Sequence, residues 1–321
     1  MSDSKVWTKK LVQQHTKVAA AIELYTVPFY TTVMTSIQDT DSDAYKIIQG
    51  VLVEEMMHLQ LAANLCVALD TTPQLTIPNY HHYIPYLKPG VVINADMAPL
   101  TARTLEEMLA IETPEEIVDD GIEKEDPSYP YSSIGEMYNA LLIGIEEKVG
   151  VDQFNWSTEN QQQFWANQGY PQIIHNIEDA KEAIKAIKEQ GEGRQVDPNI
   201  PTPYQPADFP VEEMYRMNNT APGGSYEIPI VLKEYAHYGR FLEIQRHDLP
   251  EVYTGHDDPS FQPNKELKIK LAMMIGELNM FWLGDTFMSK EARWDLTLKY
   301  MREVAKLSQT CWQHGVIPEW S

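Results

Sequence analysis

Cysteine is scarce in this sequence, and long uninterrupted apolar runs are missing. Cys66 and Cys311 are the two cysteines in 321 residues, too few for a disulfide framework or a cysteine-based zinc site, which indicates a reducing compartment. No apolar run approaches the roughly 18 residues that a membrane span needs. The N-terminus, MSDSKVWTKK, lacks the apolar core of a secretory signal. We therefore expect a cytoplasmic protein that does not associate with membranes.

Basic residues are also few. The chain holds 25 Lys and Arg against 47 Asp and Glu, so its formal net charge is -22. This balance argues against nucleic acid and anionic membrane surfaces as partners, because both attract basic patches. Hydrophobic residues make up 43% and charged residues 22%, as in ordinary soluble globular proteins. The length suffices for a sizeable core and one or two domains.

Apolar residues recur at helical spacing along most of the chain, and two proline-rich regions interrupt them. The pattern predicts helices over about 5–37, 43–69, 132–149, 177–193, 231–245, 264–284 and 289–312. We predict an all-α, ferritin-like helical bundle with a long irregular crossover and extra C-terminal helices. Its domain would cover 1–250, with proline-rich insertions at 70–130 and 194–225, and residues 251–321 would be a helical extension packed on the same domain.

Charged groups interrupt the apolar stretch VLVEEMMHLQLAANL, residues 51–65. Read as a helix, it places Glu55 and His58 on the same face as Val51 and Leu59. A buried carboxylate is costly without a partner. A metal ion is one such partner, and an ordinary buried hydrogen-bonded pair is the alternative. Glu54 lies four residues before His58, so it competes with Glu55 for the role of ligand.

A recurring arrangement explains these residues. Ferritin-like bundles hold two metal ions with a Glu from each of two helices and a Glu-x-x-His pair from each of the other two. The candidates, in helix order, are Glu23, Glu55 with His58, Glu136, and Glu234 with His237. Carboxylates balance the charge of two divalent iron or manganese ions, and one imidazole per metal leaves positions open for dioxygen or peroxide. The second Glu-x-x-His pair follows a long crossover, in the order that this arrangement requires.

Five segments together resemble a known family. They are IELYTVPFY, VEEMMHLQLAANL, SSIGEMYNAL, EQGEG and EYAHYGRF, between about residues 10 and 250. They resemble the ferritin-like family that includes the iminophenylpyruvate dimer synthases of bisindole biosynthesis. The resemblance implies a ferritin-like fold, a metal-dependent oxidative activity and the ligands named above. It also draws attention to EQGEG, where Glu189 or Glu192 would supply a carboxylate beside His237, with Glu234 then orienting a ligand.

The function that we predict is a dinuclear metal oxidoreductase. We expect two iron ions, with manganese as the alternative, and an oxidase or oxygenase reaction between a small amino-acid-derived substrate and dioxygen or peroxide. A manganese catalase-like peroxide dismutase and a non-enzymatic iron-binding protein are the two alternatives. No catalytic residue beyond the metal ligands is assigned, and association into a homo-oligomer stays open.

Three further features have structural interpretations. His81 and His82 are interpreted as an exposed loop pair in the crossover. Glu277 lies in an apolar helix and is expected to pair with Arg293 or Lys270. Tyrosines occur beside the predicted ligands, where either packing or a hydrogen bond to a ligand would occupy them; they are Tyr25, Tyr138, Tyr235 and Tyr238.

Overall fold

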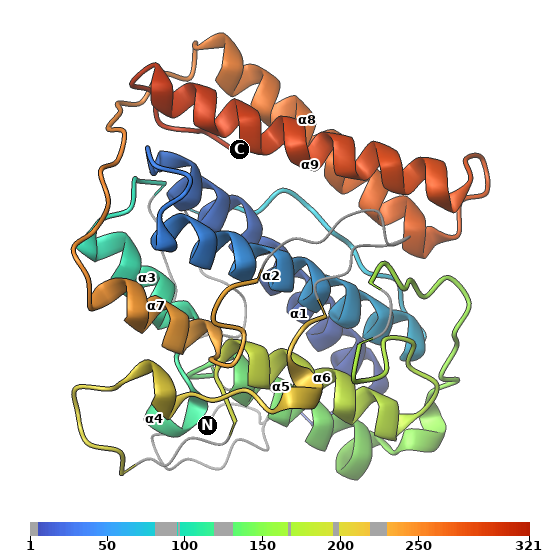
Figure 1. Ribbon diagram of the computed structural model, residues 1–321. Helices are drawn as coiled ribbons and strands as arrows, with labels where there is room; N and C mark the ends of the chain where they lie inside the picture. The colour runs from blue at the N-terminus through green and yellow to red at the C-terminus, as the bar shows by residue number, and fades with distance from the viewer. Residues whose placement is uncertain are drawn as a thin grey trace, which may run out of the picture.

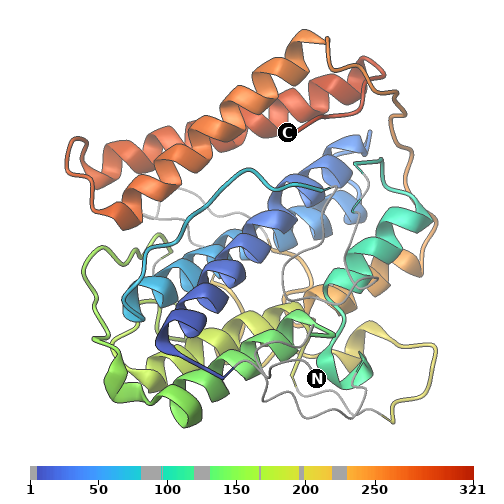
Figure 2. The same cartoon turned by 180° about the vertical axis from the view of Figure 1, so that it is seen from behind.

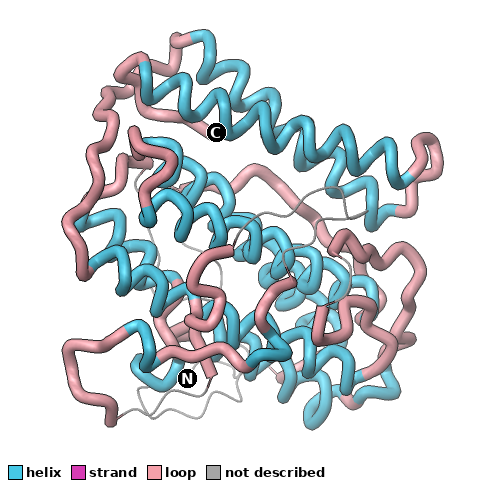
Figure 3. Tube along the Cα trace, in the orientation of Figure 1, coloured by secondary structure: helices cyan, strands magenta, loops and turns pink. Residues whose placement is uncertain are grey.

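The computed structural model describes residues 6–80, 95, 97–118, 131–165, 168–194, 199–218 and 230–321. In these residues the fold is nearly all helical, and extended pairing is limited to three isolated bridges (Figure 3). The α-helices are α1 (Lys9–Ser36), α2 (Asp43–Ala68), α3 (Ala102–Ile111), α4 (Glu115–Val118), α5 (Ile134–Ile143), α6 (Ile177–Gly191), α7 (His237–Gln245), α8 (Gln262–Leu283) and α9 (Lys290–Gln313). The predicted all-α fold is confirmed.

Polar side chains determine where several helices begin. Ser42 caps α2 with its hydroxyl, Ser133 caps α5, and Asn176 caps α6 by accepting the N–H of Asp179 at 2.9 Å. Each cap satisfies a backbone donor that has no partner within the helix. At the other end of α8, Gly284 adopts a left-handed conformation, with φ of 69°, which lets the chain turn back into α9.

The helices form three tiers (Figures 1 and 2). The antiparallel pair α1 and α2 lies in the middle. The hairpin of α8 and α9 covers one side of this pair, and α3, α5, α6 and α7 cover the other. Contacts from the C-terminal hairpin to α1 are specific as well as apolar, because the hydroxyls of Ser308 and Thr35 lie 2.6 Å apart.

The middle tier is buried on both sides. By length and composition α2 is apolar enough to cross a membrane, with a mean hydropathy of 1.2 over its most apolar window, yet 83% of that window is buried inside the protein. Burial on this scale is what the central helix of a soluble bundle shows. No other helix in the described part of the chain passes the same test.

Two predictions about elements were wrong. The crossover at 70–130 is not wholly irregular, because it contains α3 and α4. The helix predicted over 231–245 begins at His237. Residues 231–234 form a turn instead, and Tyr235 pairs with Pro210 in an extended bridge. The N–H of Val211 donates to Glu234 O and the N–H of Ala236 donates to Phe209 O, both at 2.9 Å.

Candidate metal centre

Five acidic and imidazole side chains from four helices meet between the middle and lower tiers. Glu23 comes from α1, Glu55 and His58 from α2, Glu112 from the residue that ends α3, and His237 from the first residue of α7. None of the five is more than 6% exposed. Glu55, His58 and His237 offer ligand atoms within 4.8 Å of one another, which is close enough to hold one metal ion.

Each histidine directs its Nδ1 into this cluster. Nδ1 of His58 lies 3.6 Å from Glu55 Oε1 and 3.7 Å from Glu23 Oε2. Nδ1 of His237 lies 2.9 Å from Glu55 Oε1 and 3.4 Å from Glu112 Oε2. This Nδ1 is buried and makes no hydrogen bond of acceptable geometry. A buried nitrogen without a hydrogen bond, surrounded by carboxylate oxygens, is what an imidazole ligand requires.

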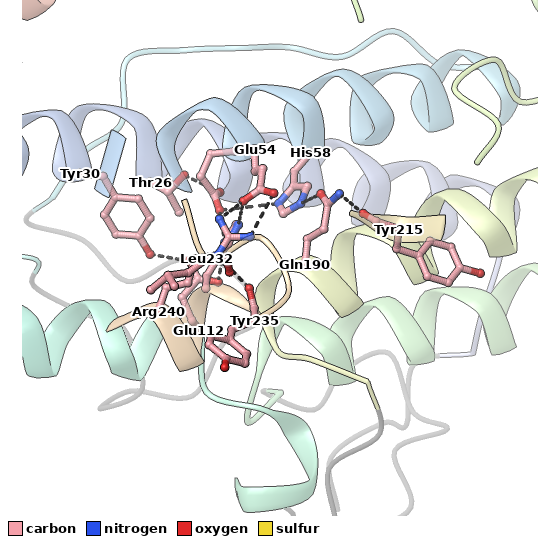
Figure 4. Close-up of polar contacts among 12 residues, drawn as sticks. Thr26, Tyr30, Glu54, His58, Glu112, Gln190, Tyr215, Leu232, Tyr235 and Arg240 are labelled. Carbon is pink, nitrogen blue, oxygen red and sulfur yellow. Dashed lines mark hydrogen bonds and ion pairs between the residues drawn. The ribbon is translucent and has the colours of Figure 1, made fainter. Parts of the chain in front are cut away.

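The other nitrogen of each ring, Nε2, lies within hydrogen-bond distance of a neighbouring side chain, as Figure 4 shows for His58 and Gln190. Nε2 of His58 lies 2.8 Å from Gln190 Oε1. The amide nitrogen of Gln190 donates to the backbone oxygen of Tyr215, so its Oε1 is the acceptor and His58 carries its proton on Nε2. Nε2 of His237 lies 3.1 Å from Glu54 Oε2. Bonds of this kind fix the ring orientation and the tautomer of metal-binding histidines.

Arg240 separates the roles of the two adjacent glutamates on α2. Glu54 is fully buried, and both its oxygens accept from the Arg240 guanidinium, Oε1 at 3.2 Å. Burial opposes ionisation of this carboxyl, but the charge of Arg240 and the bond from His237 lower its pKa to about 2. Glu54 is therefore an ionised support for His237, and Glu55 is the glutamate that faces the cluster.

The three cluster carboxylates share one pattern of hydrogen bonds. Hydroxyl groups occupy one oxygen of each: Tyr138 donates to Glu23 Oε1 at 2.7 Å, Thr26 to Glu55 Oε2 at 2.8 Å, and Tyr30 to Glu112 Oε1 at 2.5 Å. The other oxygens, Glu23 Oε2, Glu55 Oε1 and Glu112 Oε2, are the ones that approach the two Nδ1 atoms. The arrangement leaves one oxygen of each carboxylate directed at the same small space.

The carboxylates of the cluster disfavour one another's ionised forms. Burial, followed by the charge of Glu55, raises the pKa of Glu23 well above its ordinary value, and the same two causes raise the pKa of Glu112. Burial also lowers the pKa of His58. Burial opposes protonation of His237, yet the surrounding carboxylates, led by Glu112, raise its pKa well above its ordinary value. Divalent cations would stabilise the ionised forms.

The pKa of Glu55 moves in the other direction. Burial would raise it, but the close approach of His237 and the charges of both histidines lower it below its ordinary value. Glu55 is therefore the carboxylate of the cluster that stays ionised most readily. Its Oε1 is also the oxygen nearest to both Nδ1 atoms, a position suited to a carboxylate shared by two metal ions.

Glu192 lies on the wall of the same space. A cavity of about 20 Å³ is lined by Glu23, Glu55, His58 and Glu112 together with Glu192, which is room for about one water molecule. The Glu192 carboxylate accepts the N–H of Gly135 at 2.7 Å and that of Glu115 at 3.3 Å. Burial raises its pKa to about 8, against the charge of Lys188.

Three other predicted acids lie elsewhere. The carboxylate of Glu136 accepts the N–H of Ser132 in the first turn of α5. Glu189 accepts the N–H of Glu212 at 3.0 Å, and Glu234 lies half-buried in the turn before α7. None of the three lines the cavity, so the described geometry does not bring them to the cluster.

Glu112 is the carboxylate that sequence reasoning missed. It follows Ile111 at the end of ARTLEEMLAI, an amphipathic segment inside the proline-rich crossover. Thr101 and Thr104 form a reciprocal cap at its start. That cap and the apolar spacing of the segment are the signals that would have predicted a helix here, with an acid at its buried end.

The remaining side-chain predictions have separate outcomes. Glu277 pairs with Arg293 at 2.6 Å, as predicted, whereas Lys270 pairs with Glu303. Of the two alternatives for the tyrosines, Tyr138 takes the hydrogen bond, which it donates to Glu23. His81 and His82 lie outside the described residues.

An all-α bundle with carboxylates and imidazoles from four helices in its interior is the architecture of ferritin-like proteins. The sequence profile described as ferritin-like matches residues 16–246. The chain belongs to the ferritin-like family, as predicted.

Two further comparisons complete this assignment. The crystal structure of a ferritin-like protein from Caulobacter vibrioides, at 1.95 Å resolution, superposes with a TM-score of 0.72 and 23% identity, covering 98% of this chain and 99% of that one. At this identity the likeness shows the fold alone. No curated protein matches the chain.

Proposed function

We propose that the protein is a dinuclear metal oxidoreductase that holds two iron ions in the candidate metal centre. One observation carries the proposal. Three carboxylates each have one oxygen bonded to a hydroxyl group, and their other oxygens face two imidazole Nδ1 atoms in a buried space. If the cluster were an ordinary hydrogen-bonded core, Nδ1 of His237 would have a hydrogen-bond partner, because buried polar atoms are usually bonded. Here this nitrogen has none.

The proposed ligands are Glu23, Glu55, His58, Glu112, Glu192 and His237. Four carboxylates would balance the four positive charges of two divalent ions. Glu55, whose Oε1 approaches the Nδ1 atoms of both imidazoles, would be a ligand in the centre of the site. When bound, two irons would supply the electron-transfer chemistry that activates dioxygen or peroxide.

The protein's own groups prepare the site. Gln190 and Glu54 orient the two imidazoles, and Arg240 keeps Glu54 ionised. Tyr30 and Tyr138 hold the non-coordinating oxygens of Glu112 and Glu23, and burial raises the pKa of both phenols well above the ordinary value, so both stay protonated as donors. The burial of the ligand side chains limits their contact with bulk water.

A surface cleft with charged groups of both signs adjoins the metal cavity. It measures about 520 Å³ and shares Lys188 and Glu192 with the wall of that cavity. Lys181, Lys185 and Arg194 also line the cleft, each paired with a glutamate, so an amino-acid-like substrate would meet both cations and carboxylates there. Together with the five segments that resemble the iminophenylpyruvate dimer synthases, this favours an amino-acid-derived substrate.

Metal analysis of protein purified without added metal tests the centre. We expect about two iron ions per chain, and loss of at least one ion in His237→Ala and in Glu112→Ala, because each removes a ligand. Glu136→Ala is the matched control and keeps both ions, since that carboxylate caps α5. Wild-type protein without a transition metal, or Glu112→Ala with full occupancy, would refute the ligand assignment.

Oxygen measurements then test the reaction. An oxidase or oxygenase consumes dioxygen only when an organic substrate is present. Release of oxygen from peroxide by manganese-loaded protein would instead establish a catalase-like dismutase. Bound iron without either activity would indicate a protein that binds iron and does not catalyse.

A further inference from the structure

A second cavity lies on the other side of the middle tier. It measures about 170 Å³ and is lined by residues of α1 and α2 on one side and of the α8–α9 hairpin on the other. On α2, Leu52 and Met56 face this cavity, whereas Glu55 and His58 face the metal centre. The two spaces are therefore separated by the thickness of the α1–α2 pair.

The walls of this cavity are aromatic and apolar. Four of the chain's seven tryptophans line it, namely Trp165, Trp282, Trp294 and Trp320, with Phe164 beside them. Aromatic rings offer both faces and edges to another ring. Methionines from α2, α8 and α9 fill the gaps between them, and their flexible thioethers adapt to the shape of a guest.

Two of the four indoles that line the cavity are bonded to protein groups. The indole N–H of Trp282 donates to Asn64 Oδ1 at 2.9 Å, and that of Trp320 donates to Thr32 Oγ1 at 2.7 Å. Both indoles therefore present carbon to the cavity. A guest needs no hydrogen-bonding group to match them, and a charged guest would lose its hydration without replacement.

Gln60, the amide on the wall, is bonded in the same way. Its amide nitrogen donates to Gln172 Oε1 at 3.0 Å, and its oxygen accepts the N–H of Phe164 at 2.6 Å. Water in the cavity would find few partners. Apolar cavities of about 150 Å³ stay dry and take up benzene, and the 170 Å³ here is slightly larger.

We propose that this cavity is a binding site for a neutral aromatic molecule of one ring, such as toluene. Its volume sets the size of the guest, its four indoles favour a ring over an alkyl chain, and its bonded polar groups exclude charge. Binding there is independent of the metal centre, because no proposed metal ligand lines this cavity.

Thermal unfolding with added toluene tests the proposal. We expect the melting temperature to rise by about 3 °C at ten times the dissociation constant. Benzoate, a ring of similar size with a charge, should give no rise. Ala305→Leu fills the cavity from α9 and should abolish the response to toluene. Ala292→Leu adds the same atoms at an exposed position of the same helix and should keep it.

Tryptophan fluorescence gives a second readout that depends on no variant. Bromobenzene bound among the indoles should quench the emission in a saturable manner and compete with toluene. Quenching that grows linearly with bromobenzene, or a melting temperature that toluene raises equally in Ala305→Leu and wild type, would overturn the proposal.

Discussion

Arg240 shows how a single residue decides between two adjacent glutamates. Sequence spacing could not separate Glu54 from Glu55, because residues three and four positions before His58 both lie near its face of a helix. The two glutamates are distinguished by Arg240 on α7, which binds the carboxylate of Glu54. The Nε of Arg240 also donates to the backbone oxygens of Leu232 and Tyr235.

Replacing Arg240 tests this role. In Arg240→Met the carboxylate of Glu54 stays buried without its cation, so we expect a loss of about 3–5 kcal/mol in the free energy of unfolding, measured by chemical denaturation. The double variant Glu54→Leu with Arg240→Met removes both charges and should recover much of that loss. Arg246→Met is the control, because its exposed pair with Glu243 contributes little.

The position of each proposed ligand in its helix determines whether the sequence could predict it. Glu23, Glu55 and His58 share apolar faces of long helices, and His237 follows a recognisable spacing, so pattern alone found the four residues that the structure brings together. Glu112 escaped because it belongs to a short helix inside a proline-rich segment. The sequence pattern places Glu136 on the face of a helix, but it does not show that its carboxylate turns back to cap the first turn.

At the scale of elements, Gly135 brings two helices together at the metal cavity. It lies in the first turn of α5, where its N–H binds the carboxylate of Glu192 at the end of α6. A methyl group at this position would overlap both carboxylate oxygens. The absence of a side chain is therefore what lets Glu192 approach the cavity.

Gly135→Ala and Gly276→Ala form a matched pair. We expect Gly135→Ala to weaken metal binding about 10–100-fold, because it displaces Glu192, as measured by competition with a chelator. Gly276 lies within α8 beside open space, so Gly276→Ala should add about 0.5–1 kcal/mol of stability and leave metal binding unchanged. Equal metal affinity in the two variants would remove Glu192 from the site.

Helix boundaries were predictable where caps and periodicity agree. The expected bounds of α2, α6, α8 and α9 lie within about two residues of the observed ones, because each helix is long and most have a polar cap. The prediction failed at 231–236, where the chain forms a turn and then pairs through Tyr235 with Pro210. A pairing between distant segments leaves no periodic trace in the sequence.

At the scale of the whole molecule, the metal centre joins helices that are far apart in the chain. Glu23 lies on α1 and His237 on α7, with α2 and α3 between them. Without metal, the acidic groups of the site repel one another in a buried space. Bound ions would replace this repulsion by attraction across four helices.

Removing the metal should therefore loosen these helices selectively. After chelation we expect a lower melting temperature and faster amide hydrogen exchange in α1, α2, α3 and α7, while the distal parts of α8 and α9 change little. Exchange measured by mass spectrometry, with and without added iron, provides the comparison. Uniform exchange across all helices in both states would show that the centre does not hold the tiers together.

The three tiers also set an order for biosynthesis. α1 and α2 leave the ribosome well before α8 and α9, which cover one side of this pair. His237 completes the metal centre only after most of the chain has been made. During much of its synthesis, the nascent protein therefore exposes an apolar helix pair, a state to which chaperones bind. The complete set of metal ligands is available only late in synthesis.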